Sequence, residues 1–283
     1  MPTNIGLVFD FDDTLAPDST TYLLEREGVD AERFWSEEFQ SRVQAGYDPT
    51  VAYLSVLLDK VGKSEPLGEL TISDLESLGD ELNDELYPGL PDIFDDVEDI
   101  VNDYEDVAID YYIISEGLKP VIQGTDIADR CEAIYASEVD VDANDALERI
   151  QRPISFTDKT RYLYEINKGI SPDTAQENPY AVNEEIDPEN RAVPFENMIY
   201  IGDGISDIPC FSLVNDRGGR VFGVTSAEER SAKQQAIVDI GSPIRAGNLN
   251  VPEYGEDGRL GSLLRLTIEG LCTDRTIEEL EAL

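Results

Sequence analysis

The 283-residue chain contains no histidine, and this absence excludes several classes of chemistry. Without an imidazole there is no Ser-His-Asp triad, no Cys-His dyad and no His-ligated zinc site. Cysteine is also scarce: Cys131, Cys210 and Cys272 stand far apart without a CxxC pair, which predicts neither a zinc ribbon nor a disulfide framework. Catalysis in this chain must therefore depend on carboxylates, lysine, serine or threonine.

Basic residues are few. The chain has 21 Lys+Arg against 61 Asp+Glu, a net charge of −40, and only six of the basic residues are lysine. Such a surface repels itself in dilute buffer, whereas salt near roughly 1 M shortens the Debye length to about 3 Å. The composition resembles that of cytoplasmic proteins from salt-loving archaea, with an acidic protein from a low-salt organism as the alternative. Nucleic acid and anionic membranes are poor partners for this charge.

Long apolar runs are missing as well. No stretch approaches the length of about 18 apolar residues that a membrane helix needs, and the run Ile5–Phe9 stops at an aspartate, so no signal peptide is predicted. Yet 41% of the residues are hydrophobic, which is enough to fill a core in a chain of this length. We expect a soluble, cytoplasmic, globular protein whose oligomeric state stays open.

Short apolar runs alternate with longer amphipathic segments, a pattern that predicts a parallel sheet with crossover helices. The expected strands are Ile5–Phe9, Val107–Ile114, Ala133–Ser137, Met198–Ile201 and Arg220–Val224. A crossover needs only about a dozen residues, so the long interval after the first strand must hold an inserted helical subdomain. The predicted organisation is an α/β core at 1–17 and 87–283, a helical cap at 18–86 and an irregular insertion at 169–195.

Polar residues follow three of these strands. Ligands of an open parallel α/β sheet bind beyond the carboxyl ends of its strands. The three strand ends read Asp10-Phe11-Asp12-Asp13-Thr14, Ser115-Glu116-Gly117 and Gly202-Asp203-Gly204-Ile205-Ser206-Asp207. Lys159 begins a predicted helix, Lys159–Asn167, that precedes the fourth strand. We therefore expect several carboxylates, a hydroxyl and a lysine to converge at one edge of the sheet.

This combination predicts a site for metal and phosphate. Clustered carboxylates repel one another, and all-oxygen ligation by aspartate points to Mg²⁺. A lysine, a hydroxyl and backbone N–H groups at helix starts supply an anion site beside it. Acids fill 61 of 283 positions, so Asp13 and Glu116 taken singly are interpreted as solvated acids. The order and context of the whole set carry the prediction.

The four elements resemble the motifs of the haloacid dehalogenase superfamily, in its phosphoserine-phosphatase-like form. The matching positions are Asp-x-Asp-x-Thr at 10–14, Ser-x-Gly at 115–117, the lysine at 159 and Gly-Asp-Gly-x-x-Asp at 202–207. The resemblance covers the core and leaves the cap unmatched. It implies a doubly wound parallel α/β sheet with strand order 5-4-1-2-3, an inserted α-helical cap, and Mg²⁺-dependent hydrolysis of a small-molecule phosphate ester.

The resemblance also implies a role for each matching residue. Asp10 resembles the nucleophile that forms an aspartyl-phosphate, and Asp12 the general acid and base. Thr14 is expected to support the loop and the Asp12 side chain. The implied phosphate-binding residues are Thr14, Ser115, Glu116, Gly117 and Lys159, of which Lys159 is also catalytic because it neutralises charge on the transferring group. The implied Mg²⁺ ligands are Asp10, Asp12 through its carbonyl, Asp203 and Asp207.

Several alternatives stay open at this point. Glu116 either repels small anionic substrates or points outward. Lys168 rivals Lys159 as the motif lysine, because the 44 residues from Lys159 to Asp203 are an unusually long interval. Asp12 argues against a dehalogenase, since halide release needs no proton donor. The alternative functions are a phosphoryl transferase or mutase of the same superfamily and a catalytically idle binding module; the substrate is not predicted.

Overall fold

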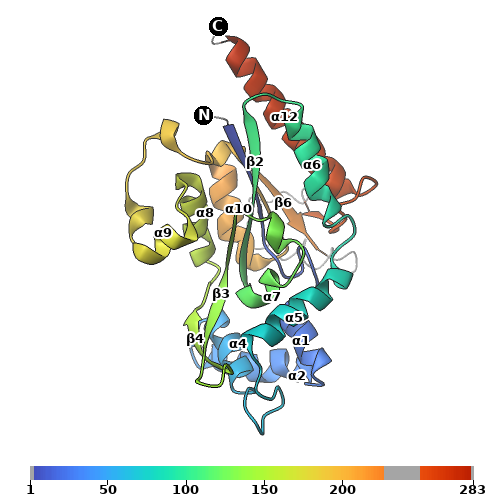
Figure 1. Ribbon diagram of the computed structural model, residues 1–283, viewed down its shortest axis with the longest axis vertical. Coiled ribbons are helices and arrows are strands. Elements are labelled where there is room, and N and C mark those ends of the chain that lie inside the picture. The colour runs from blue at the N-terminus through green and yellow to red at the C-terminus, as the bar shows by residue number, and fades with distance from the viewer. Residues whose placement is uncertain (1–2, 226–248, 282–283) are drawn as a thin grey trace.

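The centre of the computed structural model, which describes residues 3–225 and 249–281, is a seven-stranded sheet (Figure 1). The strands are β1 (Thr3–Phe9), β2 (Val107–Leu118), β3 (Ala133–Val141), β4 (Leu147–Arg152), β5 (Met198–Gly202), β6 (Arg220–Val224) and β7 (Leu249–Asn250). Their order is β4-β3-β2-β1-β5-β6-β7, and every neighbouring pair is parallel except β3 and β4. The five expected strands therefore occur in the expected order, 5-4-1-2-3, and the predicted fold class is confirmed.

The sheet differs from the expectation at its two edges. β4 and β7 were not predicted, because β4 carries mostly polar residues and β7 is only two residues long. β2 is also longer than expected. It continues to Leu118, and its register with β3 shifts between Ile114 and Leu118. The Ser115–Gly117 motif consequently lies inside the irregular end of β2 rather than in a loop after it.

Helices cover both faces of the sheet. They are α1 (Ser19–Arg26), α2 (Ala31–Arg33), the π-helix η1 (Phe34–Phe39), α3 (Gln40–Gln44), α4 (Pro49–Leu58), α5 (Ile72–Leu82), α6 (Asp92–Asn102), α7 (Lys119–Gln123), α8 (Asp158–Lys168), α9 (Pro172–Glu177), α10 (Ile208–Asp216) and α12 (Arg259–Glu281). Short 3₁₀ turns complete the chain: η2 (Asn83–Glu85), η3 (Ala128–Arg130), η4 (Ala181–Asn183), η5 (Pro188–Asn190), η6 (Phe195–Asn197) and η7 (Ile205–Asp207). Among the described helices, none is both long and apolar enough to cross a membrane.

The two faces follow from the two-residue period of a strand. Ile5, Leu7 and Phe9 of β1 belong to one hydrophobic cluster, which includes residues of α6 and α12. Val8 points to the opposite face, where its cluster includes residues of α8 and α10. The central strands are buried on both sides, so the carboxyl ends of β1 and β5 are held at fixed positions in the middle of the sheet.

Helices α1 to α5 lie between β1 and α6 in the chain and together at one end of the molecule (Figure 1). Aspartates cap two of them: Asp18 Oδ1 accepts the Thr21 N–H at the start of α1, and Asp48 Oδ1 does the same for α4. α5 packs directly on α7. A Cβ at Gly79 would lie 2.0 Å from the Val121 carbonyl oxygen, so this approach of two helices requires glycine.

The segment predicted as an irregular insertion at 169–195 contains one short helix, α9, whose start is capped by Ser171 with proline at the first helical position. It lies beside α8 (Figure 1). Lys168 Nζ, at the end of α8, donates to the Val182 and Glu184 carbonyl oxygens at 2.7 and 2.5 Å. The predicted core range 87–283 also includes residues 226–248, which lie outside the described residues.

Candidate active site

The chain leaves β1 in a tight turn that positions Asp10. The Asp10 N–H donates to the Ile201 carbonyl oxygen at 2.8 Å, which continues the pairing of β1 with β5 by one residue. The Phe11 N–H donates to Asp10 Oδ1, also at 2.8 Å. Asp13 adopts a positive φ of 55°, a conformation that aspartate tolerates better than most residues. The Asp10 carboxylate is thus buried and fixed in orientation at the carboxyl end of β1.

Lys159, in the first turn of α8, is fully buried beneath this turn. Its Nζ lies 3.1 Å from Asp10 Oδ1 and 2.8 Å from Asp207 Oδ1. Burial alone would lower the pKa of Lys159, but attraction to Asp10 and Asp207 raises it well above its ordinary value. Burial in turn raises the pKa of Asp10, although Lys159 acts in the opposite direction. The Lys159 ammonium group thus forms ion pairs with two buried carboxylates, those of Asp10 and Asp207.

Asp207, where η7 meets α10, is held by three donors. Its Oδ1 accepts Lys159 Nζ and the Tyr200 hydroxyl at 2.7 Å, and its Oδ2 accepts the Gly204 N–H at 3.1 Å. A Cβ at Gly202 would lie 2.3 Å from Asp207 Oδ2, so glycine is required there. Asp207 therefore anchors the loop after β5 and orients Lys159.

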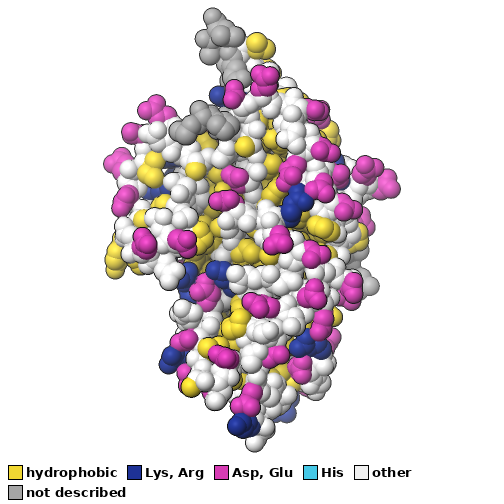
Figure 2. Space-filling model, in the orientation of Figure 1, with side chains coloured by type: hydrophobic (Ala, Val, Ile, Leu, Met, Phe, Trp, Pro, Cys, Tyr) yellow, Lys and Arg dark blue, Asp and Glu magenta, His cyan; other side chains and the backbone are white. Residues whose placement is uncertain are grey.

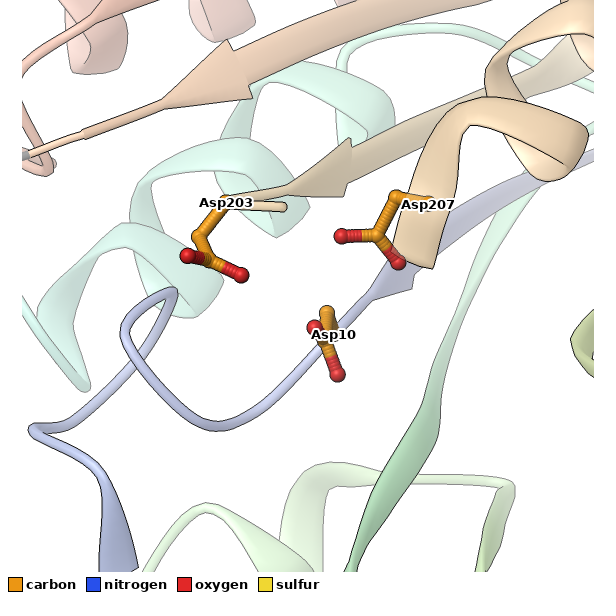
Figure 3. Close-up of side chains that lie close together, drawn as sticks. All are labelled: Asp10, Asp203 and Asp207. Carbon is orange, nitrogen blue, oxygen red and sulfur yellow. The ribbon is translucent and has the colours of Figure 1, made fainter. Parts of the chain in front are cut away.

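Three carboxylates gather at the ends of β1 and β5. Asp10, Asp203 and Asp207 each offer an oxygen, and these oxygens lie within 4.8 Å of one another (Figure 3). Three aspartates beside one lysine leave excess negative charge, and carboxylate oxygens are the ligands that Mg²⁺ prefers. The side chains present therefore fit a bound Mg²⁺. The Asp12 carboxylate is not part of this cluster. Ligation by the backbone carbonyl oxygen of Asp12, the atom expected from the resemblance, stays a prediction.

Asp12 is positioned by the helical region. The Ser19 N–H, at the start of α1, donates to Asp12 Oδ1 at 2.8 Å. A Cβ at Gly117 would lie only 2.4 Å from Asp12 Oδ2, so the glycine of the Ser-x-Gly motif makes room for this carboxylate. Burial, followed by repulsion from Asp18, raises the pKa of Asp12 to about 7. Asp12 and Asp10 are thus positioned by different partners.

The irregular end of β2 contributes a hydroxyl and a carboxylate. Ser115 is fully buried, and its Oγ accepts the Gly117 N–H at 2.9 Å. Glu116 lines the same cavity as Asp10, and its carboxylate is desolvated and interacts with Lys159, so it does not point outward. Burial raises the pKa of Glu116 to about 7, with Lys159 opposing the shift. The Glu116 carbonyl oxygen accepts the Tyr53 hydroxyl at 2.6 Å and the Ser137 hydroxyl at 2.8 Å.

Two expected participants lie elsewhere. Thr14 is fully buried and is not among the residues that line the cavity. Within residues 3–225 and 249–281 its Oγ1 has no hydrogen-bond partner, so the expected contact with the Asp12 side chain is not found there. The turn directs Thr14 beneath the loop, where its carbonyl oxygen accepts the Tyr254 hydroxyl. Lys168 holds the 169–195 segment from the far end of α8. Of the two candidate lysines, only Lys159 reaches the carboxylates.

A cavity of about 210 Å³ connects these groups with the helical region. Its lining comprises Asp10, Asp12, Asp13, Asp18, Thr20, Trp35, Phe39, Pro49, Thr50, Tyr53, Ser115, Glu116, Gly117, Lys159, Asp203 and Ser206. The side of this cavity formed by residues 18–53, which we term the roof, was not predicted. Amphipathic periodicity does not separate a helical residue that faces a ligand from one that faces the core. The remaining lining residues, together with Asp207 beneath them, form the floor.

The arginines of the helical region do not line the described cavity. Arg26 pairs with Glu27 and Glu81, and Arg42 pairs with Asp59. Arg33 pairs with two further surface glutamates. These arginines therefore belong to surface ion pairs.

Comparison with known proteins places this site in a family. The haloacid dehalogenase-like hydrolase family matches the chain over residues 7–212, a span that contains every motif residue described above. The chain belongs to this family. It is also 31% identical, over 239 residues, to an uncharacterised protein of Borreliella burgdorferi, with 75% of this chain and 79% of that protein covered.

Solved structures agree on the fold. A probable phosphoserine phosphatase from Vibrio cholerae aligns with a TM-score of 0.55 and 13% identity, covering 96% of this chain and 67% of that chain. A phospho-aspartyl intermediate analogue of phosphoserine phosphatase aligns with a TM-score of 0.52 and 13% identity, covering 93% and 99%. At these identities the likeness concerns the fold alone, a mixed α/β core of the kind that haloacid dehalogenase-like hydrolases share.

Proposed function

We propose that this protein is a Mg²⁺-dependent phosphomonoester hydrolase that acts through an aspartyl-phosphate on Asp10. The main observation is that two carboxylates with different partners, Asp10 and Asp12, line one cavity beside Lys159. The family membership and the fold shared with a phospho-aspartyl intermediate analogue of phosphoserine phosphatase support it. The helical region at 18–86 is proposed as the cap that selects a small-molecule substrate.

The reaction has two steps. An Asp10 carboxylate oxygen attacks phosphorus, and the bond from phosphorus to the ester oxygen breaks as that oxygen takes a proton from Asp12. Asp12, now a carboxylate, then removes a proton from water, which attacks phosphorus and releases Asp10. Because Ser115 Oγ accepts the Gly117 N–H, its own hydroxyl hydrogen remains available to donate to a phosphoryl oxygen. Lys159 Nζ offsets negative charge on Asp10 and on the phosphoryl group.

Asp10 and Asp203 would hold the Mg²⁺, while Asp207 steadies the loop that carries Asp203. When bound, the ion offsets repulsion between the Asp10 carboxylate and an anionic phosphate. Ligation by Asp207 itself competes with the three donors that already occupy its oxygens.

Two amide substitutions test the mechanism. Asp10→Asn should abolish turnover of all phosphate esters, because an amide is a very poor nucleophile. Asp12→Asn should slow an alkyl phosphate by about 10²–10⁴-fold and an activated aryl phosphate much less, since that leaving group needs no proton. Steady-state hydrolysis in molar KCl with Mg²⁺ measures both effects, and chelation of the metal should stop the wild type.

Asp80→Asn, an exposed substitution on α5, is the matched control and should retain full activity. If the wild type hydrolyses no ester, the idle binding module becomes the better account. If the phosphoryl group passes to an alcohol in preference to water, the protein is a transferase. Full activity of Asp10→Asn contradicts the aspartyl-phosphate.

We also propose that the surface is adapted to high salt, in the cytoplasm of a halophilic archaeon. Acidic side chains spread over the visible face, while basic ones are few (Figure 2). With a net charge of −40, the free energy of unfolding should fall progressively below roughly 1 M KCl as screening fades. Circular dichroism against KCl measures this, with sucrose as a non-ionic control. A chain that stays fully folded in millimolar buffer contradicts the adaptation.

A further inference from the structure

The cavity carries few positive charges and several negative ones, and this imbalance bears on the substrate. Among the described lining residues the only Lys or Arg is Lys159. Its Nζ is already in contact with Asp10 and Asp207, and the side chain is fully buried. The described lining thus offers no further cation to a carboxylate or a second phosphate on the leaving group.

Two further acidic residues of the cavity, Glu116 in the floor and Asp18 in the roof, lie outside the carboxylate cluster of Asp10, Asp203 and Asp207. The Glu116 side chain lines the cavity, and in the described part of the chain no hydrogen bond or ion pair reaches the Glu116 carboxylate. Asp18 lines the cavity from the roof, with Oδ1 on the Thr21 N–H. Burial and the nearby carboxylates, Glu116 and Asp18 among them, raise the pKa of the Tyr53 phenol. Both acids line the cavity together with Tyr53, whose hydroxyl donates to the Glu116 carbonyl oxygen.

The same part of the cavity has aromatic side chains. The Trp35 ring centroid lies 5.4 Å from that of Phe39 and 6.0 Å from that of Tyr53. Trp35 Nε1 donates to Thr21 Oγ1 at 2.8 Å, and the Tyr53 hydroxyl donates to the Glu116 carbonyl oxygen, so both rings are fixed. Aromatic faces attract an organic cation, and a tryptophan face attracts it most strongly.

We infer that the preferred substrate is the phosphate ester of a small alcohol that carries an ammonium group, a proposal that rests on the proposed function and deepens it. An uncharged aromatic leaving group would pack against the rings but would leave the Glu116 carboxylate without an ionic partner. An ammonium group interacts with the rings and with the acids, because it packs against the aromatic faces and offsets the charge of the carboxylates. The cavity volume of about 210 Å³ favours a small amino alcohol over a nucleotide.

A pair of isosteric substrates isolates the charge. Choline phosphate and 3,3-dimethylbutyl phosphate differ by a quaternary nitrogen in place of carbon. We expect the wild type to favour choline phosphate in kcat/KM by about tenfold or more, and to hydrolyse ethanolamine phosphate faster than phosphoserine, which adds a carboxylate. Glu116→Gln should lower the choline preference by about three- to tenfold. Trp35→Leu should lower it independently, through the loss of the indole face.

Glu25→Gln is the matched control, since it removes one exposed carboxylate of α1 that does not line the cavity, and it should leave the preference unchanged. Circular dichroism establishes that each variant is folded. A preference near one in the wild type overturns the inference, as does a high preference that survives both Glu116→Gln and Trp35→Leu. p-Nitrophenyl phosphate separates the two proposals: its hydrolysis without any ammonium preference overturns this inference alone. If no ester is hydrolysed, the proposed function fails, and the inference fails with it.

Discussion

The floor and the roof of the cavity are built in different ways. In the floor, buried charges meet one another directly: Lys159 lies between Asp10 and Asp207, and Tyr200 donates to the same Asp207 oxygen. In the roof, rings pack edge to face and a single hydroxyl, that of Tyr53, reaches the end of β2. The floor is organised by electrostatics inside a buried core, and the roof by packing at its margin.

The two kinds of organisation predict which substitutions should be costly. Removing one member of a buried ionic cluster leaves its partners desolvated and uncompensated, which costs far more than the loss of a hydrogen bond between neutral groups. Substitutions in the floor should therefore affect folding and catalysis together. Substitutions in the roof should affect the binding of substrate more than the stability of the fold.

The largest effect on stability is expected for Lys159→Met. Asp10 and Asp207 would remain buried without a cation, so the free energy of unfolding should fall by about 3–5 kcal/mol. Urea unfolding in metal-free buffer with molar KCl measures it. Lys168→Met, at the other end of α8, removes only two bonds to carbonyl oxygens and should cost about 1–2 kcal/mol. Equal losses of unfolding free energy in the two variants would contradict the larger cost assigned to the buried ionic cluster.

Adding a methyl group at position 117 tests whether the position of the Asp12 carboxylate in the cavity is critical. In Gly117→Ala the new Cβ would meet Asp12 Oδ2 at 2.4 Å, so the carboxylate must move. We expect kcat for an alkyl phosphate to fall by about 10²-fold, with the fold retained. Gly270→Ala, within α12, has nothing within 4 Å of the new methyl and should leave kcat unchanged. An undiminished kcat in Gly117→Ala means that the position of Asp12 is not critical.

The smallest effect is expected in the roof, from Tyr53→Phe. The Glu116 carbonyl oxygen keeps its bond from Ser137, so the loss of the Tyr53 hydroxyl should cost only about 0.5–1.5 kcal/mol of unfolding free energy. KM should rise a few-fold while kcat changes little. Tyr47→Phe, on an exposed ring, is the control. A large fall in kcat would mean that Tyr53 acts in catalysis, as the floor residues do, and not in substrate binding alone.

The floor could be predicted from the sequence because its residues follow strands directly. Asp10, Ser115 and Asp203 each stand at the end of a short apolar run, and the parallel topology brings those ends together. Lys159 was expected from its place at the start of a helix. Thr14 shows the limit: its spacing is right for a site residue, but the turn buries it below the cavity.

The roof could not be predicted in the same way. Asp18 precedes α1, Trp35 belongs to η1 and Tyr53 to α4, and no spacing connects them. Their meeting depends on how the helices pack, which is a tertiary property. The direction of Glu116 also depended on an irregular register between β2 and β3 that the alternation of apolar residues does not reveal. The edge strand β4 was missed because its polar residues resemble those of a loop.

The close approach of α5 to α7 at Gly79 has a consequence for how molecules enter and leave. Because the backbones of these helices approach so closely, we expect α5 to stay with the core in any opening of the cavity. We therefore expect the chain from α1 to α4 to move more readily than α5. The Tyr53 hydroxyl and the Thr50 hydroxyl, which donates to the Ile154 carbonyl oxygen, hold α4 to the core. We expect these two hydrogen bonds to slow the entry of substrate and the departure of product.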